Sequence, residues 1–302
     1  MTFPSQALLA WYAQFGRTHL PWRTTRDPYR VLVSEFMLQQ TQVERVLPLY
    51  EAFVARFPDF PALASADAAD AVRMWRGLGY NSRALRLHRI ARIVVAGDGS
   101  LPHEREALLA LPGIGPYTAA ALRAFAFERD DVALDTNLRR VVHRVLLGIE
   151  HPARASEREL DALLRAALPA GSAHDWNSAL MDLGATLCTA RAPKCLVCPL
   201  RDSCAAAPID PVTLAVAARE HAKKKTPQEA LPFEQTQRFL RGRVIDRLRD
   251  LPPKASITLA ALEADLRSIV PPARVPEIAA IVQALIRDGF VVECAGEYTL
   301  QG

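Results

Sequence analysis

Four of the five cysteines in this 302-residue chain lie in one short segment, "LCTARAPKCLVCPLRDSC". They are Cys188, Cys195, Cys198 and Cys204, with the spacing C-x6-C-x2-C-x5-C. Thiolates bind zinc and iron–sulfur clusters, and zinc sites usually pair two C-x2-C elements across a longer spacer. A single C-x2-C with one cysteine on either side favours a [4Fe–4S] cluster over zinc. Either ligand is favoured over four buried thiols that bind nothing. The fifth cysteine, Cys294, is expected to be a core residue.

Two carboxylates stand beside apolar runs. Glu35 lies within "VSEFMLQQ", and Asp135 follows the apolar run of "VALDTNLRR" where a helix should begin. A carboxyl group among apolar side chains either pairs its charge or has its pKa raised. Cleavage of a glycosidic bond uses one carboxyl to protonate the leaving group and another to stabilise an oxocarbenium-like sugar. The pair indicates this chemistry, although an N-cap role alone would explain Asp135 equally well.

A glycine turn occurs in "LPGIGPYTAAALRAFAF", where Gly113 and Gly115 stand on either side of Ile114 and Pro116 opens a helix. Free backbone N–H groups at the start of a helix can bind a phosphate without reading nucleotide sequence. The turn therefore predicts contact with a DNA backbone, and an ordinary corner between two helices remains the alternative.

The residues before Cys204 show the pattern of short amphipathic helices, which must position these groups. The Val/Ile-rich alternating runs that indicate strands are absent from this region. Apolar spacing and capping residues predict the class as all-α. The expected helices begin at about Ser5, Asp27 and Thr41 and then span 67–76, 82–96, 104–110, 116–127, 136–147, 156–167 and 174–187.

The composition changes after Cys204. Residues 205–234, which include the lysine run 223–225, are predicted to be a partly helical linker. Residues 235–302 then read as helix, short strand, two helices and two strands around Gly296, the order of a small α+β winged helix. The third helix has balanced charge, and the arginines concentrate on the first helix. This predicts an accessory clamp or structural cap that reads no sequence. The arginines are Arg238, Arg241, Arg243, Arg247 and Arg249.

The chain is mildly basic, with a net charge of +4 and a pI of about 8.9. This permits a nucleic-acid partner without requiring one. No apolar run reaches the length of a bilayer span, and the N-terminus lacks the pattern of a signal peptide. We expect a monomer with no membrane partner, located in the cytoplasm and associated with the nucleoid.

Seven motifs in order give a specific resemblance that covers about residues 5–205. They are "LPWR", "SEFMLQQTQV", "GLGY", "LPGIGPYTA", "LDTNLRR", "MDLGATLC" and the cysteine spacing. The chain resembles the helix-hairpin-helix DNA glycosylases of the endonuclease III superfamily, and within it the MutY-type adenine DNA glycosylases. The resemblance implies a glycosylase region over 1–204. This comprises a six-helix domain at about 24–130 and an iron–sulfur domain made of the N-terminal helix with 131–204.

Roles follow from the resemblance, position by position. Glu35 matches the acid that protonates adenine and helps to activate water, and Asp135 matches the residue that stabilises the cationic sugar. Asn137 matches the asparagine that supports this site. Tyr117 stands where bifunctional lyases carry lysine, which implies a monofunctional enzyme. The four cysteines match the ligands of a [4Fe–4S] cluster.

The resemblance also implies contacts with DNA. Trp22, Arg23, Leu38 and Val43 match the pocket around the extruded base. Gln40, Thr41 and Tyr80 match residues that fill the gap left by the flipped base and contact the opposite base. Gly113, Ile114 and Gly115 match the hairpin that binds the DNA backbone. Arg191 and Lys194 match residues near the DNA phosphates.

Some positions depart from the family pattern. Asn81 stands where a second tyrosine is common, Thr136 replaces glycine, and Ser178 stands where Gln or Glu is frequent. The Nudix-like C-terminal domain of MutY-type enzymes is not found in 235–302. The departures bear on which base is preferred opposite adenine.

The predicted activity is hydrolysis of the N-glycosidic bond of adenine mispaired with 8-oxoguanine or guanine. The partner is mismatched double-stranded DNA, with the base flipped out because it cannot be reached within the stack. One alternative is a thymine or uracil mismatch glycosylase of the same fold. Another is a non-catalytic iron–sulfur protein that binds DNA or senses redox state. The presence of both Glu35 and Asp135 argues against the latter.

Overall fold

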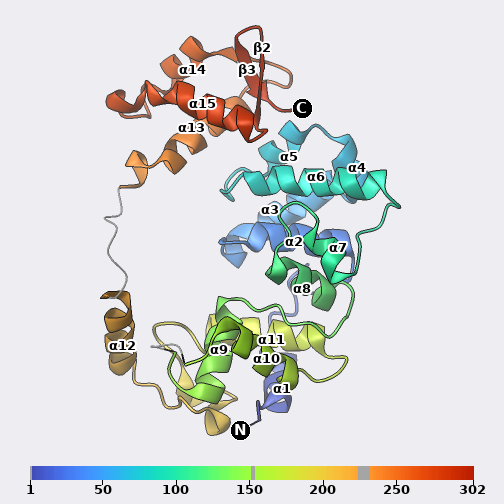
Figure 1. Ribbon diagram of the computed structural model, residues 1–302, viewed down its shortest axis with the longest axis vertical. Coiled ribbons are helices and arrows are strands. Elements are labelled where there is room, and N and C mark those ends of the chain that lie inside the picture. The colour runs from blue at the N-terminus through green and yellow to red at the C-terminus, as the bar shows by residue number, and fades with distance from the viewer. Residues whose placement is uncertain (1, 151–153, 224–231) are drawn as a thin grey trace. The chain divides into compact units, whose positions relative to one another are not determined.

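Helices form most of the regular structure in the computed structural model, which describes residues 2–150, 154–223 and 232–302 (Figure 1). The helices before the linker are α1 (Ser5–Phe15), α2 (Pro28–Leu38), α3 (Val43–Arg56), α4 (Phe60–Ser65), α5 (Ala68–Met74), α6 (Ser82–Ala96), α7 (Arg105–Leu109), α8 (Pro116–Phe125), α9 (Thr136–Leu147), α10 (Glu157–Ala167) and α11 (Ala173–Thr186). The predicted all-α class of this region is confirmed. The sequence did not predict α4, a short helix capped by Asp59, whose carboxylate accepts from the Ala62 amide.

The remaining elements are α12 (Pro211–Lys223), α13 (Gln237–Arg249), β1 (Ile257–Thr258), α14 (Leu259–Leu266), α15 (Glu277–Arg287), β2 (Val291–Cys294) and β3 (Glu297–Leu300). The strands form an antiparallel sheet in the order β1-β3-β2, with Ile257 opposite Tyr298 and Val291 opposite Leu300. The predicted α+β C-terminal domain is thus confirmed. The expectation that Cys294 is a core residue was wrong, because its side chain is exposed on β2. Lys224 and Lys225 lie outside the described residues.

The chain packs into two units, each built from two stretches of sequence. The first unit contains Met1–Glu35 and Leu101–Pro227, and the second contains Phe36–Ser100 and Gln228–Gly302. No helix in the described ranges is long and apolar enough to cross a bilayer.

The core of the first unit forms where α1 and α9 pack against α11 and α10 packs against α9 (Figure 1). Its centre is Trp176, which is fully buried and donates from Nε1 to the Ser5 hydroxyl at 3.1 Å. Ser5 in turn donates to the carbonyl of Ala167 at 2.7 Å. These bonds satisfy polar groups that burial would otherwise destabilise. They also connect the N-terminal helix to α10 and α11.

The core of the second unit has an aromatic cluster and a separate C-terminal apolar layer. Phe53 contacts both Phe57 and Trp75 edge to face, with ring centroids 5.0 and 5.8 Å apart, a preferred geometry for aromatic pairs. The C-terminal layer is built by buried residues of α13, α14 and α15, namely Leu240, Val244, Leu248, Leu262, Leu266, Ile278, Val282 and Leu285.

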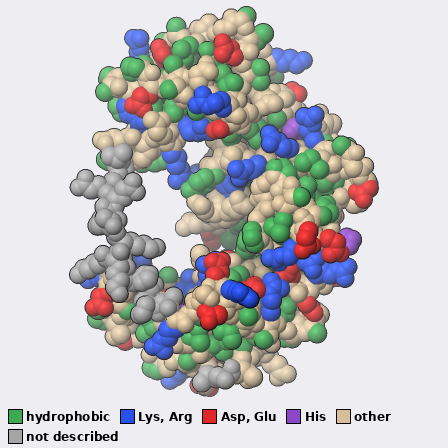
Figure 2. Space-filling model, in the orientation of Figure 1, with side chains coloured by type: hydrophobic (Ala, Val, Ile, Leu, Met, Phe, Trp, Pro, Cys, Tyr) green, Lys and Arg blue, Asp and Glu red, His purple; other side chains and the backbone are tan. Residues whose placement is uncertain are grey.

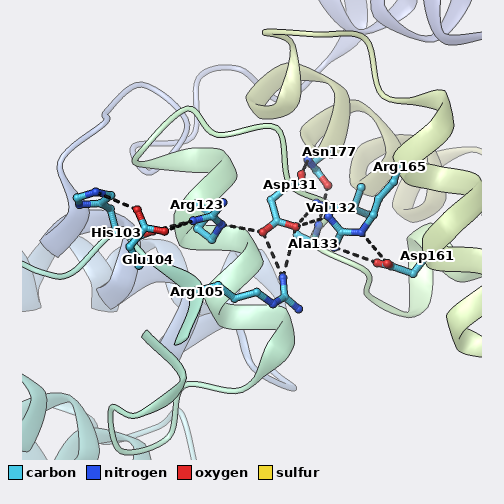
Figure 3. A network of polar contacts seen from close by, with 10 residues as sticks. All are labelled: His103, Glu104, Arg105, Arg123, Asp131, Val132, Ala133, Asp161, Arg165 and Asn177. Carbon is cyan, nitrogen blue, oxygen red and sulfur yellow. Dashed lines mark hydrogen bonds and ion pairs between the residues drawn. The ribbon is translucent and has the colours of Figure 1, made fainter. Parts of the chain in front are cut away.

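A buried carboxylate fixes the segment that leads to Asp135. Asp131 is 3% exposed and forms ion pairs with Arg105, Arg123 and Arg165 at 3.2, 2.9 and 2.9 Å (Figure 3). Burial acts to raise the pKa of Asp131, but the amide of Val132 and the guanidinium groups hold the pKa below its ordinary value.

Two residues beyond Asp131, the Ala133 amide donates to Asn177 Oδ1 at 2.9 Å (Figure 3). Asn177 Nδ2 donates to the carbonyl of Asp131 at 2.9 Å. Since Asn177 belongs to α11, this side chain secures the whole 131–133 segment to that helix.

We expect Asp131→Asn to lower the free energy of unfolding at pH 7 by about 2 kcal/mol, because three guanidinium groups lose their shared counter-charge. Their partial exposure keeps the effect below that of a fully buried pair. The pKa of Asp131 is depressed in the folded state, so its contribution is present above the unfolded value of about 3.8 and disappears as the pH falls through the folded value. Denaturant unfolding at pH 7 and pH 3 measures the difference. Asp161→Asn, which removes only a half-exposed partner of Arg165, is the control and should cost under about 0.5 kcal/mol.

Candidate active site

Glu35 lies in the last turn of α2 and is 6% exposed. Burial raises its pKa to about 7, while a hydrogen bond from Tyr117 and the charge of Arg23 act to lower it and the charge of Asp135 acts to raise it. The carboxyl therefore exists in both protonation states near neutral pH, which is the condition for a general acid that can also act as a base.

Tyr117, at the start of α8, lies beside Glu35. Burial, followed by the negative charges of Glu35 and Asp135, raises the pKa of its phenol well above the usual value. The phenol is thus neutral at physiological pH and donates a hydrogen bond to the Glu35 carboxylate. Three of the predicted catalytic side chains, from three different helices, are therefore brought together.

Asp135 is the N-cap of α9. Its Oδ1 accepts from the Leu138 amide at 2.7 Å, and its Oδ2 accepts from Asn137 Nδ2 at 2.9 Å. Burial raises the pKa of Asp135, and these hydrogen bonds act to lower it. The capping role is confirmed. It does not prevent Asp135 from acting on the site near Glu35, because each carboxylate oxygen has two lone pairs and keeps acceptor capacity.

Asn137 is itself held in place. Its Oδ1 accepts from Arg140 Nη2 at 2.8 Å, and Arg140 also donates to the carbonyls of Gly184 and Cys188 at 2.7 and 2.8 Å. A Cβ atom at Gly184 would lie 2.7 Å from Cβ of Asn137, closer than packed atoms approach. The absence of a side chain at 184 thus lets α11 approach α9 at the residue that orients Asp135.

Another buried carboxylate, which the sequence reasoning missed, organises the "LPWR" segment. Asp182 is 1% exposed in α11 and accepts from Arg17 Nη2 at 2.7 Å and from Arg23 Nη2 at 3.5 Å. Arg23 also donates to the Tyr12 hydroxyl at 3.0 Å. The signal was available, since Asp182 lies among apolar positions of a helix just as Glu35 does.

The predicted gap residues belong to the second unit and line one cavity there. Gln40 and Tyr80 both have positive φ angles, 56° and 44°, and Thr41 lies next to Gln40. Such conformations are unfavourable for residues with side chains and concentrate at functional sites. Tyr80 is 41% exposed, and the guanidinium groups of Arg83 and Arg238 lie over its ring, 5.7 and 4.3 Å from the centroid.

Arg83, which the sequence analysis did not select, holds these two segments together. Its Nη1 donates to the carbonyls of Phe36 and Gln39 at 2.6 and 2.7 Å, and its Nη2 donates to those of Leu78 and Gly79 at 3.0 and 3.1 Å. Burial lowers its pKa to about 10, so it remains charged at neutral pH. One cation therefore satisfies the carbonyls of both strained turns.

The other predicted DNA-contacting residues are placed as follows. Trp22 is buried in the first unit, while Leu38 ends α2 and Val43 begins α3 in the second unit. In the turn between α7 and α8, Gly113 has a φ of 86°, which favours glycine, and is exposed. The Ile114 side chain is buried, so only the backbone of this turn can face a ligand. Ser178 is fully buried, and within the described residues its hydroxyl has no hydrogen-bond partner.

The four clustered cysteines line one small cavity with apolar neighbours such as Val141 and Leu200. Burial and the other three thiols raise the pKa of Cys198 to about 11, so forming its thiolate is unfavourable. A bound cationic group would offset this free-energy cost. Within the described ranges, no three Cys, His, Asp or Glu side chains are gathered around a point that could hold one metal ion. Four thiols that line one apolar cavity fit a [4Fe–4S] cluster, which has four separate iron corners and needs no common point for a single ion.

A buried arginine lies next to these thiols. Arg144, whose side chain is fully buried, donates to Cys188 Sγ at 3.6 Å and to the carbonyl of Thr189 at 2.8 Å. Hydrogen bonds to ligand sulfur and positive charge both stabilise the anionic form of a thiolate-bound cluster. Arg191 and Lys194 are exposed on the same loop.

Comparison with known proteins agrees with this arrangement. The model of the HhH-GPD superfamily of base excision DNA repair proteins matches residues 33–166, and that of the iron–sulfur binding domain of endonuclease III matches residues 188–204. The fold and the site thus define a helix-hairpin-helix repair protein that carries a [4Fe–4S] cluster at Cys188, Cys195, Cys198 and Cys204.

Its relatives narrow this class. The adenine DNA glycosylase of Mycolicibacterium smegmatis is 38% identical over 308 aligned positions, which cover 100% of this chain and 97% of the relative. The human adenine DNA glycosylase is 39% identical over 66% of this chain and 38% of its own length. The chain belongs to the adenine DNA glycosylase family.

A solved structure is also similar. A thermostable thymine-DNA glycosylase has a TM-score of 0.62 and 32% identity, covering 67% of this chain and 93% of its own.

Proposed function

We propose that this protein is a monofunctional glycosylase that hydrolyses the N-glycosidic bond of adenine mispaired with 8-oxoguanine or guanine in duplex DNA. The observation that carries the proposal is the buried Glu35 carboxyl, with a pKa of about 7, beside Tyr117 and Asp135. Adenine is a poor leaving group until a ring nitrogen is protonated, and a carboxyl that keeps its proton near neutral pH can supply that proton.

The steps follow from the residues. Glu35 donates its proton to a ring nitrogen of the flipped adenine as the bond to the sugar breaks and its electron pair leaves with the base. Asp135 stabilises the oxocarbenium-like sugar electrostatically. The deprotonated Glu35 then takes a proton from the water that attacks the sugar carbon, which restores the acid. Tyr117 supplies no amine for a Schiff base, so the product is an intact abasic strand.

The proposed contacts with the DNA backbone are sequence-independent. The turn at Gly113, Ile114 and Gly115 offers backbone N–H groups to a phosphate, and Arg191 and Lys194 offer side-chain cations. When bound, the cluster gives the loop that carries these two residues a fixed shape. Gln40, Thr41 and Tyr80 are proposed to contact the gap and the opposite base, with Trp22, Arg23, Leu38 and Val43 around the extruded adenine.

Base release from a panel of duplexes tests this function. Adenine opposite 8-oxoguanine and guanine should be excised, and borohydride should trap little protein on the DNA. The second candidate, a thymine mismatch glycosylase, is favoured by the similarity to the thermostable thymine-DNA glycosylase. Release of thymine opposite guanine, with adenine left in place, would establish that candidate instead.

The pH dependence of base release should report Glu35. The acid must carry its proton, so the single-turnover rate should fall as the pH rises through about 7. Tyr117→Phe removes a hydrogen bond that stabilises the carboxylate, and we expect the falling limb to move to higher pH by about one unit. Tyr298→Phe, which removes a phenol from β3, should leave the limb in place. A limb that Tyr117→Phe did not move would indicate that another group supplies the proton.

A further inference from the structure

The Tyr12 side chain, on the N-terminal helix α1, is buried in the first unit and is 4% exposed. Its ring lies against Gly16 at the end of that helix, where a Cβ atom would be 2.3 Å from Cδ2 of the ring. Atoms that are not bonded do not pack so closely, so the ring can lie here only because position 16 has no side chain. The ring, and with it the hydroxyl, is therefore held in one place.

The Tyr12 hydroxyl is an uncharged partner for a buried cation. The side chain of Arg23 is 8% exposed, and its Nη1 donates to the hydroxyl at 3.0 Å. Its Nη2 lies 3.5 Å from Asp182 Oδ1, at the limit of a hydrogen bond. The shorter of these two contacts is thus made with a hydroxyl and not with a carboxylate.

The charge of Asp182 is directed mainly at a different arginine. Arg17 donates to Asp182 from its amide at 2.8 Å, from Nε at 3.0 Å and from Nη2 at 2.7 Å. Charge-assisted bonds of this length are the strong ones, so Arg17 largely balances the carboxylate. The positive charge of Arg23 is therefore only weakly offset by Asp182.

The charge of Arg23 acts on the catalytic pair. Burial has the largest effect on the pKa of Glu35 and of Tyr117, which it raises, and the charge of Arg23 acts to lower both. The other groups that face Glu35 are the Tyr117 phenol on α8 and the Asp135 carboxylate at the start of α9. His174 on α11 also lies within reach of the charge of Arg23, but burial lowers its pKa, so it is largely neutral where Glu35 titrates.

Exposed charges of the first unit have less influence on this site. Over α9 and α10, basic and acidic side chains lie side by side on the surface, where water and salt screen them (Figure 2). The Arg23 guanidinium is buried and is screened much less. Its position therefore affects how readily Glu35 keeps its proton.

We propose that Tyr12 is a positioning residue for base release, which holds the Arg23 guanidinium in place near the Glu35 acid. The inference rests on the proposed function and adds to it a contribution from the N-terminal helix. A fixed cation stabilises the carboxylate that forms when Glu35 gives its proton to adenine, and a mobile cation does so less well. The Tyr12 hydroxyl fixes this cation without cancelling its charge, as a carboxylate in the same place would.

The pH dependence of single-turnover adenine release tests the proposal. Tyr12→Phe keeps the ring and removes only the hydroxyl, so Arg23 becomes more mobile and its effect on Glu35 weakens. Because that effect lowers the pKa of Glu35, the falling limb should move to higher pH, by about half a pH unit in Tyr12→Phe and about one in Arg23→Gln. The double variant should behave as Arg23→Gln alone, because Tyr12 acts through Arg23.

Ser5→Ala is the matched control on the same helix. Ser5 bonds to the Ala167 carbonyl and to Trp176, so its loss should lower the melting temperature and leave the limb in place. A limb that stayed in place in Tyr12→Phe or in Arg23→Gln would overturn the proposal. So would a further shift when Tyr12→Phe is added to Arg23→Gln, since Tyr12 would then act independently of Arg23.

A carbon-13 titration of labelled glutamate side chains, assigned with Glu35→Gln, follows the protonation of Glu35 without any substrate. The Glu35 midpoint should rise in Tyr12→Phe and stay unchanged in Ser5→Ala. An unchanged midpoint in Tyr12→Phe would contradict the inference. Failure of the unaltered protein to release adenine from any duplex would instead remove the proposed function.

Discussion

Replacing Glu35 by glutamine should reduce adenine release by about a thousandfold or more while leaving affinity for mismatched DNA within about threefold. Glutamine has nearly the same shape and can accept the hydrogen bond from Tyr117, but it has no proton of suitable acidity. General acid–base catalysis contributes about 10²–10⁴ in rate, and this side chain is proposed to act in both leaving-group protonation and water activation.

Single-turnover base release and anisotropy binding on the same duplex separate the two effects. Glu44→Gln is the matched control, since Glu44 is exposed in the first turn of α3 and the substitution changes charge identically. If Glu35→Gln retained more than about a tenth of the rate, the assignment of Glu35 as the acid would be untenable.

Replacing Cys198 by serine should remove most of the bound iron and weaken DNA binding at least about tenfold at moderate salt. Three thiolates and a hydroxyl hold a [4Fe–4S] cluster poorly, and the loop that presents Arg191 and Lys194 then loses its fixed shape. The loss of two phosphate contacts lowers both the affinity and its salt dependence.

Iron analysis, visible absorption and anisotropy titrations at several salt concentrations measure these effects without relying on activity. Cys294→Ser provides the control, because that thiol is exposed on β2, far along the sequence from the four ligands. Full iron content in Cys198→Ser would mean that Cys198 is not a ligand.

Many of the helices in both units could be predicted because their signals are local. The Ser156 capping box, with Glu159 returning a bond to the Ser156 amide, is present at the start of α10. Periodicity placed α6 and α9 correctly for the same reason, since apolar spacing determines which face of a helix is buried. Helix α4 was missed because six residues give too short a pattern.

The site was only partly predictable, because proximity depends on packing. The sequence does not predict that Tyr117 donates a hydrogen bond to Glu35, because 82 positions separate the two residues. Asp182 and Arg83 escaped notice for a related reason. Each is a charged residue whose partners, Arg17 and the carbonyls of two turns, are identified only by the fold.

The close approach at Gly184 has a consequence for sorting related sequences by their chemistry. A methyl group at 184 would collide with Asn137, so the two positions are not free to change separately. A sequence with alanine at the position of Gly184 must either shift α11 or have glycine in place of Asn137, and in the second case Asp135 loses the amide that holds its Oδ2. Glycine at this position, together with asparagine at the position of Asn137, therefore indicates an intact glycosylase centre. A relative that keeps its four cysteines but lacks this pair would be expected to bind DNA without cutting the glycosidic bond.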